Sequence, residues 1–261
     1  AVPFHMWTPV VYQGAPTSVT AFFAMVPKIA AMALLMRLLF EPFGMMADQW
    51  MQIIYFLSVA SMVVGAFAAI AQDNLKRLLA YSSIGNMGYA LIGIAAGTQA
   101  GASAVILYLL IYMIMTAGVF AIVLCMRRDD QMLVKISDLS GLSRNNRGLA
   151  YAMAILMFSM AGIPPFAGFF GKLAIFSAAV EAEFYILAVI GVLTSVIGAY
   201  YYLRVIKVMF FDEPEDAYDA GFPFARKVVL ALSIIFVVGF IIKPGLILET
   251  TQAAATSLFS G

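Results

Sequence analysis

The chain has 261 residues, of which 64% are hydrophobic and only 11% are charged, and its formal net charge is +1. Soluble domains carry about 25% charged residues, so this composition excludes an ordinary soluble domain and indicates a membrane protein. The sequence has no basic run and no marked positive balance, which argues against a nucleic-acid partner.

The sequence contains few residues that bind metals or redox cofactors. Its only cysteine is Cys125, and its only histidine is His5. These two residues cannot build a disulfide, a zinc site, an iron–sulfur cluster or a bis-histidine haem site. We therefore expect no cofactor and no metal in this chain, and we expect any electron transfer to occur elsewhere.

Apolar stretches long enough to cross a bilayer, about 20 residues each, recur along the whole chain. They lie at 16–40, 50–71, 75–96, 103–126, 148–181, 184–209 and 225–248. The pattern predicts an all-α, multi-pass transmembrane helix bundle formed by a single membrane domain over residues 1–261. The chain begins without an initiator methionine or a signal-peptide pattern, so we interpret it as part of a longer protein.

The fifth stretch is interrupted near its middle. The sequence Gly-Ile-Pro-Pro occupies positions 162–165, and Gly168 and Gly171 follow. Each proline removes a backbone donor and clashes with the preceding turn, so we predict half-helices at 148–163 and 166–181 with a non-helical joint. Irregular backbone at membrane depth is tolerated only against protein or water, and in transporters such breaks often lie on the transport path.

The charged residues of the connectors are divided unequally between the two sides of the membrane. One set of connectors carries most of the basic residues: Lys76, Arg77, Arg127, Arg128, Lys135, Arg144, Arg147, Arg204, Lys207, Arg226 and Lys227. The opposite set carries Glu41, Asp48, Glu181 and Glu183, flanked only by Arg37 and Lys243. The positive-inside rule then predicts that the basic side is cytoplasmic and that the carboxyl terminus lies outside.

Two lysines are not explained by the connectors. Lys28 lies about twelve residues into the first stretch, near mid-bilayer at ~1.5 Å per residue. Lys172 follows the double proline by less than two turns. A charge at the bilayer centre costs about 2.5–3.5 kcal/mol on insertion scales, which favours a functional role. The alternative is that each side chain extends to a membrane interface.

Lys76 differs from these two because it opens the third stretch. It follows Asp73 and Asn74, which form a suitable helix cap, and it precedes Arg77. From the residues alone, an anchor at the membrane interface is the favoured interpretation. No Asp or Glu lies deep in any stretch, and a lysine ammonium has no lone pair for a metal cation, so buried lysines suit proton relay better than metal-ion transport.

Other polar residues share helical faces within the stretches. Ser82, Asn86 and Tyr89 recur at helical spacing in the third stretch, as do Tyr108, Tyr112 and Thr116 in the fourth. They could line a polar path for protons, or they could form hydrogen bonds that hold helices together. The sequence leaves both alternatives open.

Four blocks of sequence resemble the family of subunit N of proton-pumping NADH:quinone oxidoreductase, respiratory complex I. They are Val2-Pro3-Phe4-His5-Met6-Trp7-Thr8-Pro9 with Val11-Tyr12-Gln13-Gly14-Ala15-Pro16-Thr17 and Lys28; Leu75-Lys76-Arg77-Leu78-Leu79-Ala80-Tyr81-Ser82-Ser83-Ile84; Ala161-Gly162-Ile163-Pro164-Pro165 through Gly168-Phe169-Phe170-Gly171-Lys172; and Tyr200-Tyr201-Tyr202-Leu203-Arg204. The blocks follow the family order along nearly the whole chain, which resembles the family's carboxyl-terminal part. The Pro-Pro block alone is shared by all antiporter-like subunits.

The resemblance implies inverted five-helix repeats, and it implies that Lys28, Lys76 and Lys172 lie on a central hydrophilic axis. For Lys76, this favours a relay role over the interfacial anchor. Two positions depart from the family pattern: Val10 stands where Asp is usual, and Gly148 stands where Pro is common. The first departure puts the role of an acid near that position in doubt.

The resemblance also implies a function. We expect a proton-translocating membrane-arm subunit of a bacterial inner membrane, driven by quinone reduction in neighbouring subunits, with Lys28 and Lys172 as relay groups and Lys76 as a relay or access group. NADH, flavin, iron–sulfur clusters and quinone would bind other subunits, and the partners would be other membrane-arm subunits and the lipid bilayer. The alternatives are a subunit of a multisubunit cation/proton antiporter or membrane-bound hydrogenase, and an assembly scaffold without transport.

Overall fold

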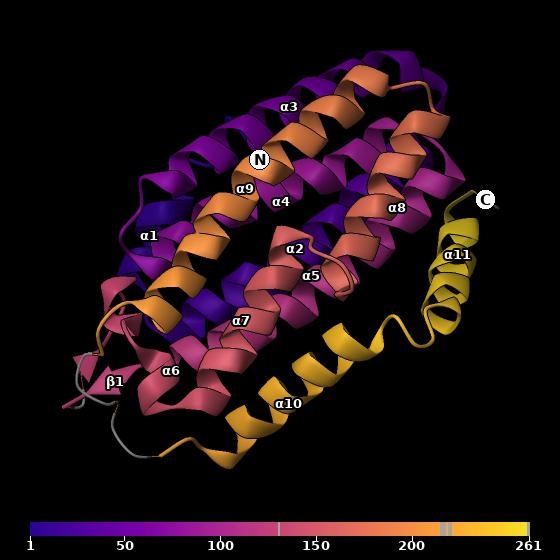
Figure 1. The fold of residues 1–261 in the computed structure, drawn as a ribbon. Helices are drawn as coiled ribbons and strands as arrows, with labels where there is room; N and C mark the ends of the chain where they lie inside the picture. The colour runs from indigo at the N-terminus through magenta and orange to yellow at the C-terminus, as the bar shows by residue number, and fades with distance from the viewer. Residues whose placement is uncertain (130, 215–217, 219–220, 260–261) are drawn as a thin grey trace.

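The computed structural model describes residues 1–129, 131–214, 218 and 221–259, and helices form most of it (Figure 1). The α-helices are α1 (Thr8–Gly14), α2 (Thr17–Phe40), α3 (Ala47–Ile70), α4 (Leu75–Ala95), α5 (Gln99–Val123), α6 (Leu142–Asn145), α7 (Arg147–Ala161), α8 (Ala167–Glu181), α9 (Tyr185–Phe211), α10 (Phe224–Gly239) and α11 (Gly245–Phe259). Short 3-10 helices cover Gly44–Met46 and Ser137–Leu139. The predicted all-α membrane bundle is confirmed.

The long helices α2, α3, α4, α5 and α9 run alongside one another through the bundle (Figure 1). Within the described residues, these are the five helices that are long and apolar enough to cross a membrane, with α3 counted from Gly44. In the most apolar 18-residue segment of α4, 94% of the residues are buried, against 28% in that of α2 and 39% in that of α3. The third apolar stretch therefore forms the centre of the bundle, and the residues on α4 face protein on nearly every side.

The predicted break in the fifth apolar stretch is confirmed. Helix α7 ends at Ala161, and Gly162 follows in the left-handed region with φ of +85°. Helix α8 begins at Ala167, so the non-helical joint spans 162–166. The two helices are the predicted half-helices, except that α7 ends two residues earlier than predicted and α8 begins one residue later.

The last predicted stretch, 225–248, is wrong as a single helix. Helix α10 ends at Gly239, and α11 begins at Gly245 after the Lys243-Pro244 pair. Proline lacks the amide donor that a continuous helix needs. The apolar stretch therefore continues through a point at which the backbone cannot remain helical. Helix α10 has 16 residues, which span ~24 Å at 1.5 Å per residue, less than the ~30 Å apolar core of a bilayer.

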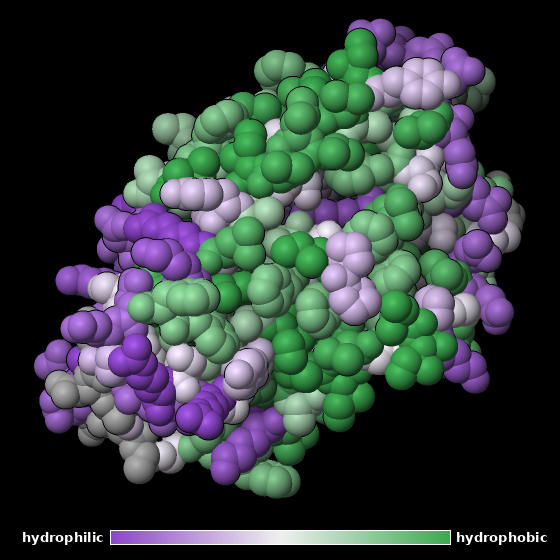
Figure 2. Space-filling view, viewed as in Figure 1, coloured by the Kyte–Doolittle hydropathy of each residue, from purple (hydrophilic) through white to green (hydrophobic). Residues whose placement is uncertain are grey.

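A short hairpin was not predicted from the sequence. Strands β1 (Arg127–Arg128) and β2 (Gln131–Met132) pair antiparallel, with Arg127 opposite Met132. The hairpin and α6 lie at one end of the bundle, and the α8–α9 connector lies at the other (Figure 1). Hydrophilic residues gather at both ends and apolar residues cover most of the face between them (Figure 2), as expected for a bundle embedded in lipid.

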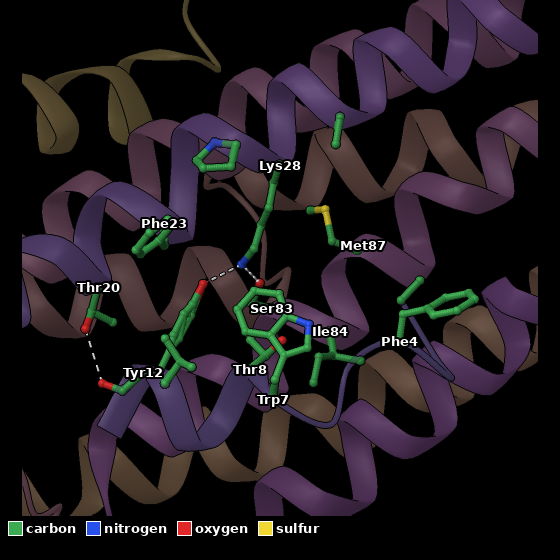
Figure 3. Close-up of a pocket in the computed structure, with 14 residues that line it drawn as sticks. Phe4, Trp7, Thr8, Tyr12, Thr20, Phe23, Lys28, Ser83, Ile84 and Met87 are labelled. Carbon is green, nitrogen blue, oxygen red and sulfur yellow. Dashed lines mark hydrogen bonds between the residues drawn. The ribbon is translucent and has the colours of Figure 1, made fainter. Parts of the chain in front are cut away.

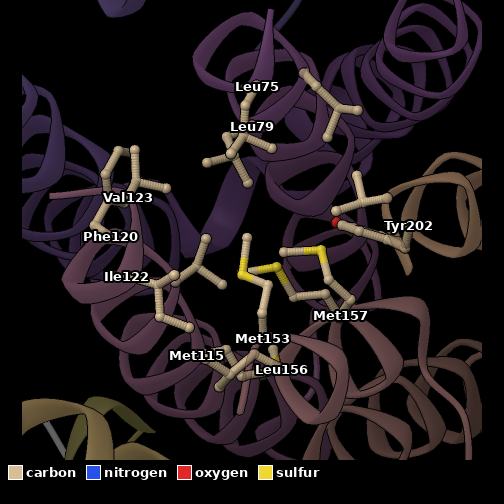
Figure 4. Close-up of a cluster of buried hydrophobic side chains, with 14 of the residues drawn as sticks. Leu75, Leu79, Met115, Phe120, Ile122, Val123, Met153, Leu156, Met157 and Tyr202 are labelled. Atoms are coloured by element: carbon tan, nitrogen blue, oxygen red, sulfur yellow. The ribbon is translucent and has the colours of Figure 1, made fainter. Parts of the chain in front are cut away.

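Two apolar clusters occupy the interior, one toward each end of α4. Toward the hairpin end, side chains of α4, α5, α7 and α9 meet around Leu75, Met153 and Tyr202 (Figure 4). Toward the other end, Ile92 and its neighbours form the second cluster. The polar residues Ser82, Ser83 and Asn86 lie between the two, so a polar layer separates two apolar clusters along the central helix.

Candidate functional site

Lys28 points into the protein and not toward lipid. Its Nζ donates a hydrogen bond of 2.6 Å to the Tyr12 hydroxyl and another to the Ser83 hydroxyl (Figure 3). The ammonium also lies 5.1 Å from the centre of the Tyr12 ring. Helix α1 and central helix α4 thus both supply oxygen atoms to a lysine that α2 carries.

A cavity of about 280 Å³ adjoins Lys28 (Figure 3). Its walls include the apolar side chains of Trp7, Phe23 and Met87, and Lys28 and Ser83 provide polar groups. The volume is enough for several water molecules, since one water occupies about 30 Å³ of liquid. Water at this place could hydrate the ammonium within the bundle.

Lys172 is buried where the broken helix is joined, with 6% of its surface exposed. Its Nζ donates to the carbonyl oxygens of Met160 and Ala161 at 3.2 and 2.9 Å, and to the Ser195 hydroxyl at 2.8 Å. The last carbonyls of a helix have no partner within the helix and carry the negative end of its dipole. The break that the prolines impose on α7 therefore creates the acceptors that hold Lys172.

Lys76 is buried too, with 4% of its surface exposed, although the residues around it favoured an interfacial anchor. Its Nζ donates a 2.8 Å hydrogen bond to the carbonyl of Ala15, which ends α1 just before Pro16. Asn74 caps α4 as predicted, because its side chain accepts a bond from the Arg77 amide. The sequence around Lys76 does not reveal that this side chain is buried, because the segment that covers it, at the end of α1, lies sixty-one residues earlier in the chain.

Neutral oxygen atoms hold all three lysines. Ion pairs join Arg37 to Glu41, Arg204 to Asp73 and Lys207 to Asp212, and no ion pair within the described residues includes Lys28, Lys76 or Lys172. A lysine bonded to a carboxylate is held in the charged form, whereas one bonded to carbonyls and hydroxyls can lose its proton without leaving an unpaired anion. The environment of these lysines is compatible with both the charged and the neutral form.

Hydroxyl and amide groups of α4, α5 and α9 form a second set of hydrogen bonds, centred on Asn86. Asn86 donates to Ser82 and Tyr202, and Tyr108 donates to Asn86. Tyr89 lies under Lys172, with its ring centre 5.2 Å from Nζ. The predicted polar faces of α4 and α5 thus meet around Asn86, but Thr116 has no hydrogen-bond partner for its hydroxyl among the described residues.

Helix α9 contributes three residues that the sequence analysis missed. Thr194 accepts a hydrogen bond from Tyr89, Ser195 accepts one from Lys172, and Tyr202 lies within 2.5 Å of the Ser82 hydroxyl. Thr194, Gly198 and Tyr202 recur every four residues and so share one face of the helix. That spacing is the signal that could have identified α9 as the third wall of the polar layer. Tyr12 and Ser83 were likewise missed as partners of Lys28.

Comparison with known proteins identifies the family. Residues 1–198 match the family described as NADH:quinone oxidoreductase/Mrp antiporter, TM. The chain belongs to this family. Its antiporter-like membrane fold thereby agrees with the resemblance found in the sequence blocks.

Curated relatives of the chain are subunits N of NADH-quinone oxidoreductase. NADH-quinone oxidoreductase subunit N of Parvibaculum lavamentivorans is 56% identical over 99% of the chain, and subunit N 1 of Rhizobium meliloti is 57% identical over 99%. The chain spans about half the length of these curated relatives, 53% and 54%. The similarity to subunit N therefore extends beyond the four sequence blocks to nearly the whole of this chain.

Solved structures of the family share the fold. A chain of respiratory complex I from Thermus thermophilus with bound aureothin matches 95% of this chain with a TM-score of 0.81 and 36% identity, over 54% of its own length. A chain of the Mrp complex from Dietzia matches 99% with a TM-score of 0.86 and 26% identity, over 56% of its own length. The fold alone therefore does not separate the two branches of the family, whereas sequence identity favours the complex I branch.

Replacing Gly162 with alanine should disturb the joint that holds Lys172. An L-residue in the left-handed conformation costs roughly 1–2 kcal/mol, and a Cβ at this position would lie 2.9 Å from Lys172 Cδ. We expect Gly162→Ala to lower the unfolding temperature of the membrane complex by roughly a few degrees in a thermal melt.

Gly148→Ala is the matched control, because Gly148 lies at the other end of α7 and its added Cβ would meet only Asn146 Oδ1, at 3.8 Å. Identical melting curves for the two variants would contradict the requirement for glycine at position 162.

Proposed function

We propose that this chain is part of a proton-translocating membrane-arm subunit of NADH:quinone oxidoreductase, in which Lys28, Lys76 and Lys172 relay protons. The proposal rests on one observation above all: Lys28, Lys76 and Lys172 are bonded only to neutral oxygen atoms within the bundle. Lys76 and Lys172 are buried and Lys28 is half-buried, and Lys28 and Lys172 adjoin the polar layer at the centre of the bundle. NADH, flavin, iron–sulfur clusters and quinone would act on other subunits, and this chain would hold none of them.

The chemistry of each lysine follows from its partners. A proton arriving at Lys172 would form an ammonium that the Met160 and Ala161 carbonyls and the Ser195 hydroxyl stabilise. A proton leaving it would give an amine that can still accept a hydrogen bond from Ser195. Lys28 would likewise donate to the Tyr12 and Ser83 hydroxyls as an ammonium and accept a hydrogen bond from one of them as an amine. Each site can therefore be loaded and emptied without disrupting the helices around it.

Coupling to the membrane voltage requires these sites to change their proton affinity during a cycle. Moving one charge across a membrane is worth about 2.3 kcal/mol per 100 mV. The change would come from neighbouring subunits, as the charge or conformation next to the lysines changes when quinone is reduced. The partners are then other membrane-arm subunits within the inner membrane of a bacterium.

A cation/proton antiporter subunit is the second candidate, because the Mrp complex of Dietzia shares the fold with a TM-score of 0.86. The lysines favour protons over metal ions in both cases, since an ammonium cannot coordinate a cation. An assembly scaffold is disfavoured, because a lysine is costly at membrane depth and a neutral donor would hold the same helix end without a charge. The experiment on Lys172 separates relay from scaffold.

Lys172→Ala and Lys172→Arg should both impair proton pumping driven by NADH in membrane vesicles. Alanine removes the proton carrier, and arginine keeps a charge that is not released at neutral pH. We expect a loss on the order of tenfold or more, because groups that transfer protons contribute about 10²–10⁴-fold to rates. Oxidation of NADH by artificial electron acceptors should remain.

Lys207→Ala is the control for this experiment, since Lys207 is exposed and forms an ion pair of 3.6 Å with Asp212. Assembly is checked on native gels for each variant. An assembled Lys172→Ala enzyme that pumps at the rate of Lys207→Ala would refute the relay role of Lys172.

We also propose that the hairpin end of the bundle is cytoplasmic and that α11 is periplasmic, because basic residues gather on the connectors of the hairpin end. Cysteines introduced at Ser143 and Ser257, in a background with Cys125→Ser, should react from opposite sides of the membrane. An impermeant thiol reagent added to intact cells is expected to label only the Ser257→Cys subunit. Labelling of both positions would overturn the orientation.

A further inference from the structure

The side chain of Asn86 is the centre of the polar layer. Its Nδ2 donates to the Ser82 carbonyl at 2.8 Å, to the Ser82 hydroxyl at 3.2 Å and to the Tyr202 hydroxyl at 3.4 Å. Its Oδ1 accepts a 2.6 Å hydrogen bond from the Tyr108 hydroxyl. Only 5% of Asn86 is exposed, so α4, α5 and α9 meet at this one amide.

The Ser82 carbonyl determines which way the amide faces. A carbonyl oxygen only accepts hydrogen bonds, so the atom of Asn86 that faces it must be the donor Nδ2. The oxygen Oδ1 consequently faces α5. Because Oδ1 has no proton to give, the hydroxyl of Tyr108 must donate its single proton toward Asn86.

An amide differs from a hydroxyl in how it handles protons. A hydroxyl accepts a proton on a lone pair and releases its own to the next group, so a row of hydroxyls can relay. A carboxamide keeps its Nδ2 protons and does not take one on Oδ1 at ordinary pH. Hydrogen bonds therefore run unbroken from Tyr202 through Asn86 to Tyr108, but protons cannot follow them.

The lysines lie in separate hydrogen-bonded groups around this interruption. Lys28 bonds Tyr12 and Ser83, and Lys172 bonds Ser195 and the end of α7. Within the part of the chain that the structure describes, no hydrogen bond joins either group to Asn86. Tyr108 lies near the Lys172 group, because its ring packs against Gly171, where an added Cβ would be 3.1 Å from Tyr108 Cδ2, and its ring centre is 6.4 Å from that of Tyr89, on which Lys172 lies.

We propose that Asn86 is a positioning residue that keeps the Lys28 and Lys172 groups apart by holding the Tyr108 proton, and that protons pass when Tyr108 turns away from it. The inference rests on the proposed relay function and adds the residue that controls the connection. Asn86 itself carries no proton. It determines the direction in which Tyr108 donates, and so determines when the two lysine groups are joined.

Two variants of Asn86 separate positioning from simple packing. Asn86→Leu keeps the approximate volume but removes both the donor and the acceptor. Asn86→Asp keeps the shape: in the protonated form it has one O–H donor for the Ser82 carbonyl and one acceptor for Tyr108, as asparagine has. As a carboxylate it has acceptors only, and one of them would face the Ser82 carbonyl.

The experiment measures protons pumped per NADH by the whole complex in vesicles between pH 6 and pH 8. We expect Asn86→Leu to lose more than half of the pumping at every pH, because a Tyr108 that is never held leaves the two lysine groups connected throughout the cycle and lets protons return. We expect Asn86→Asp to be impaired at the alkaline end and to recover as the pH falls, because protonation restores the donor. A residue that only holds helices together would change the assembly and the unfolding temperature with pH, and would leave the protons pumped per NADH by the assembled enzyme unchanged.

Tyr108→Phe keeps the ring and removes only the hydroxyl, so it tests the inference even if Asn86→Leu does not assemble. It should lose pumping because the two lysine groups can then never be joined, and adding Asn86→Leu should cause no further loss, because Asn86 acts only through the Tyr108 hydroxyl. Ser58→Ala is the control: this equally buried hydroxyl on α3 bonds the Gly88 carbonyl at 2.8 Å, outside the polar layer.

The outcomes distinguish this inference from the function it rests on. Normal pumping by Tyr108→Phe and by assembled Asn86→Leu, with pumping lost in Lys172→Ala, overturns the role of Asn86 and leaves the relay intact. Normal pumping by Lys172→Ala overturns the relay itself. A flat pH profile for an assembled Asn86→Asp enzyme also overturns the positioning role.

Discussion

Basic side chains hold the carboxyl ends of four helices, and the arrangement of the bundle depends on these bonds. Lys76 binds the end of α1, Arg204 the end of α3, Arg226 the end of α5 and Lys172 the end of α7. The last carbonyls of a helix have no partner within it, and a cation stabilises the negative end of the helix dipole. In a bundle without surrounding water, these carbonyls need N–H donors and these basic side chains need oxygen acceptors. The interruption after α7 therefore provides the acceptors that allow Lys172 to be buried.

The same bonds distinguish two kinds of basic residue. Arg204 also pairs with Asp73, at 2.7 Å, in the connector that follows α3. Lys172 lies deeper, beside the joint between two half-helices, and Lys28 lies opposite it across the polar layer around Asn86. Apolar clusters close this layer toward both ends of α4. The polar layer thus lies between two apolar clusters, the arrangement that the proposed relay requires.

Much of this arrangement could be predicted from the sequence because its causes are local. The double proline predicted the joint after Gly162, and hydropathy predicted the central helices and placed Lys28 and Lys172 at depth. The rest depends on contacts between distant segments. Lys76 is adjacent to Arg77 and looks interfacial until α1 is seen to cover it, and the partners on α9 are recognised only once that helix lies beside α4. Hydropathy also failed at Pro244, where an apolar stretch contains a break in the helix.

Direct observation of the lysine protons tests the central claim that these side chains change protonation in a working enzyme. Difference infrared spectra of the whole complex, labelled with ¹⁵N at lysine Nζ, would be compared before and after reduction by NADH. The relay account predicts ammonium bands that shift with the isotope, appear on reduction and weaken in Lys172→Ala. A difference spectrum without lysine bands, from an enzyme that pumps protons normally, would contradict it.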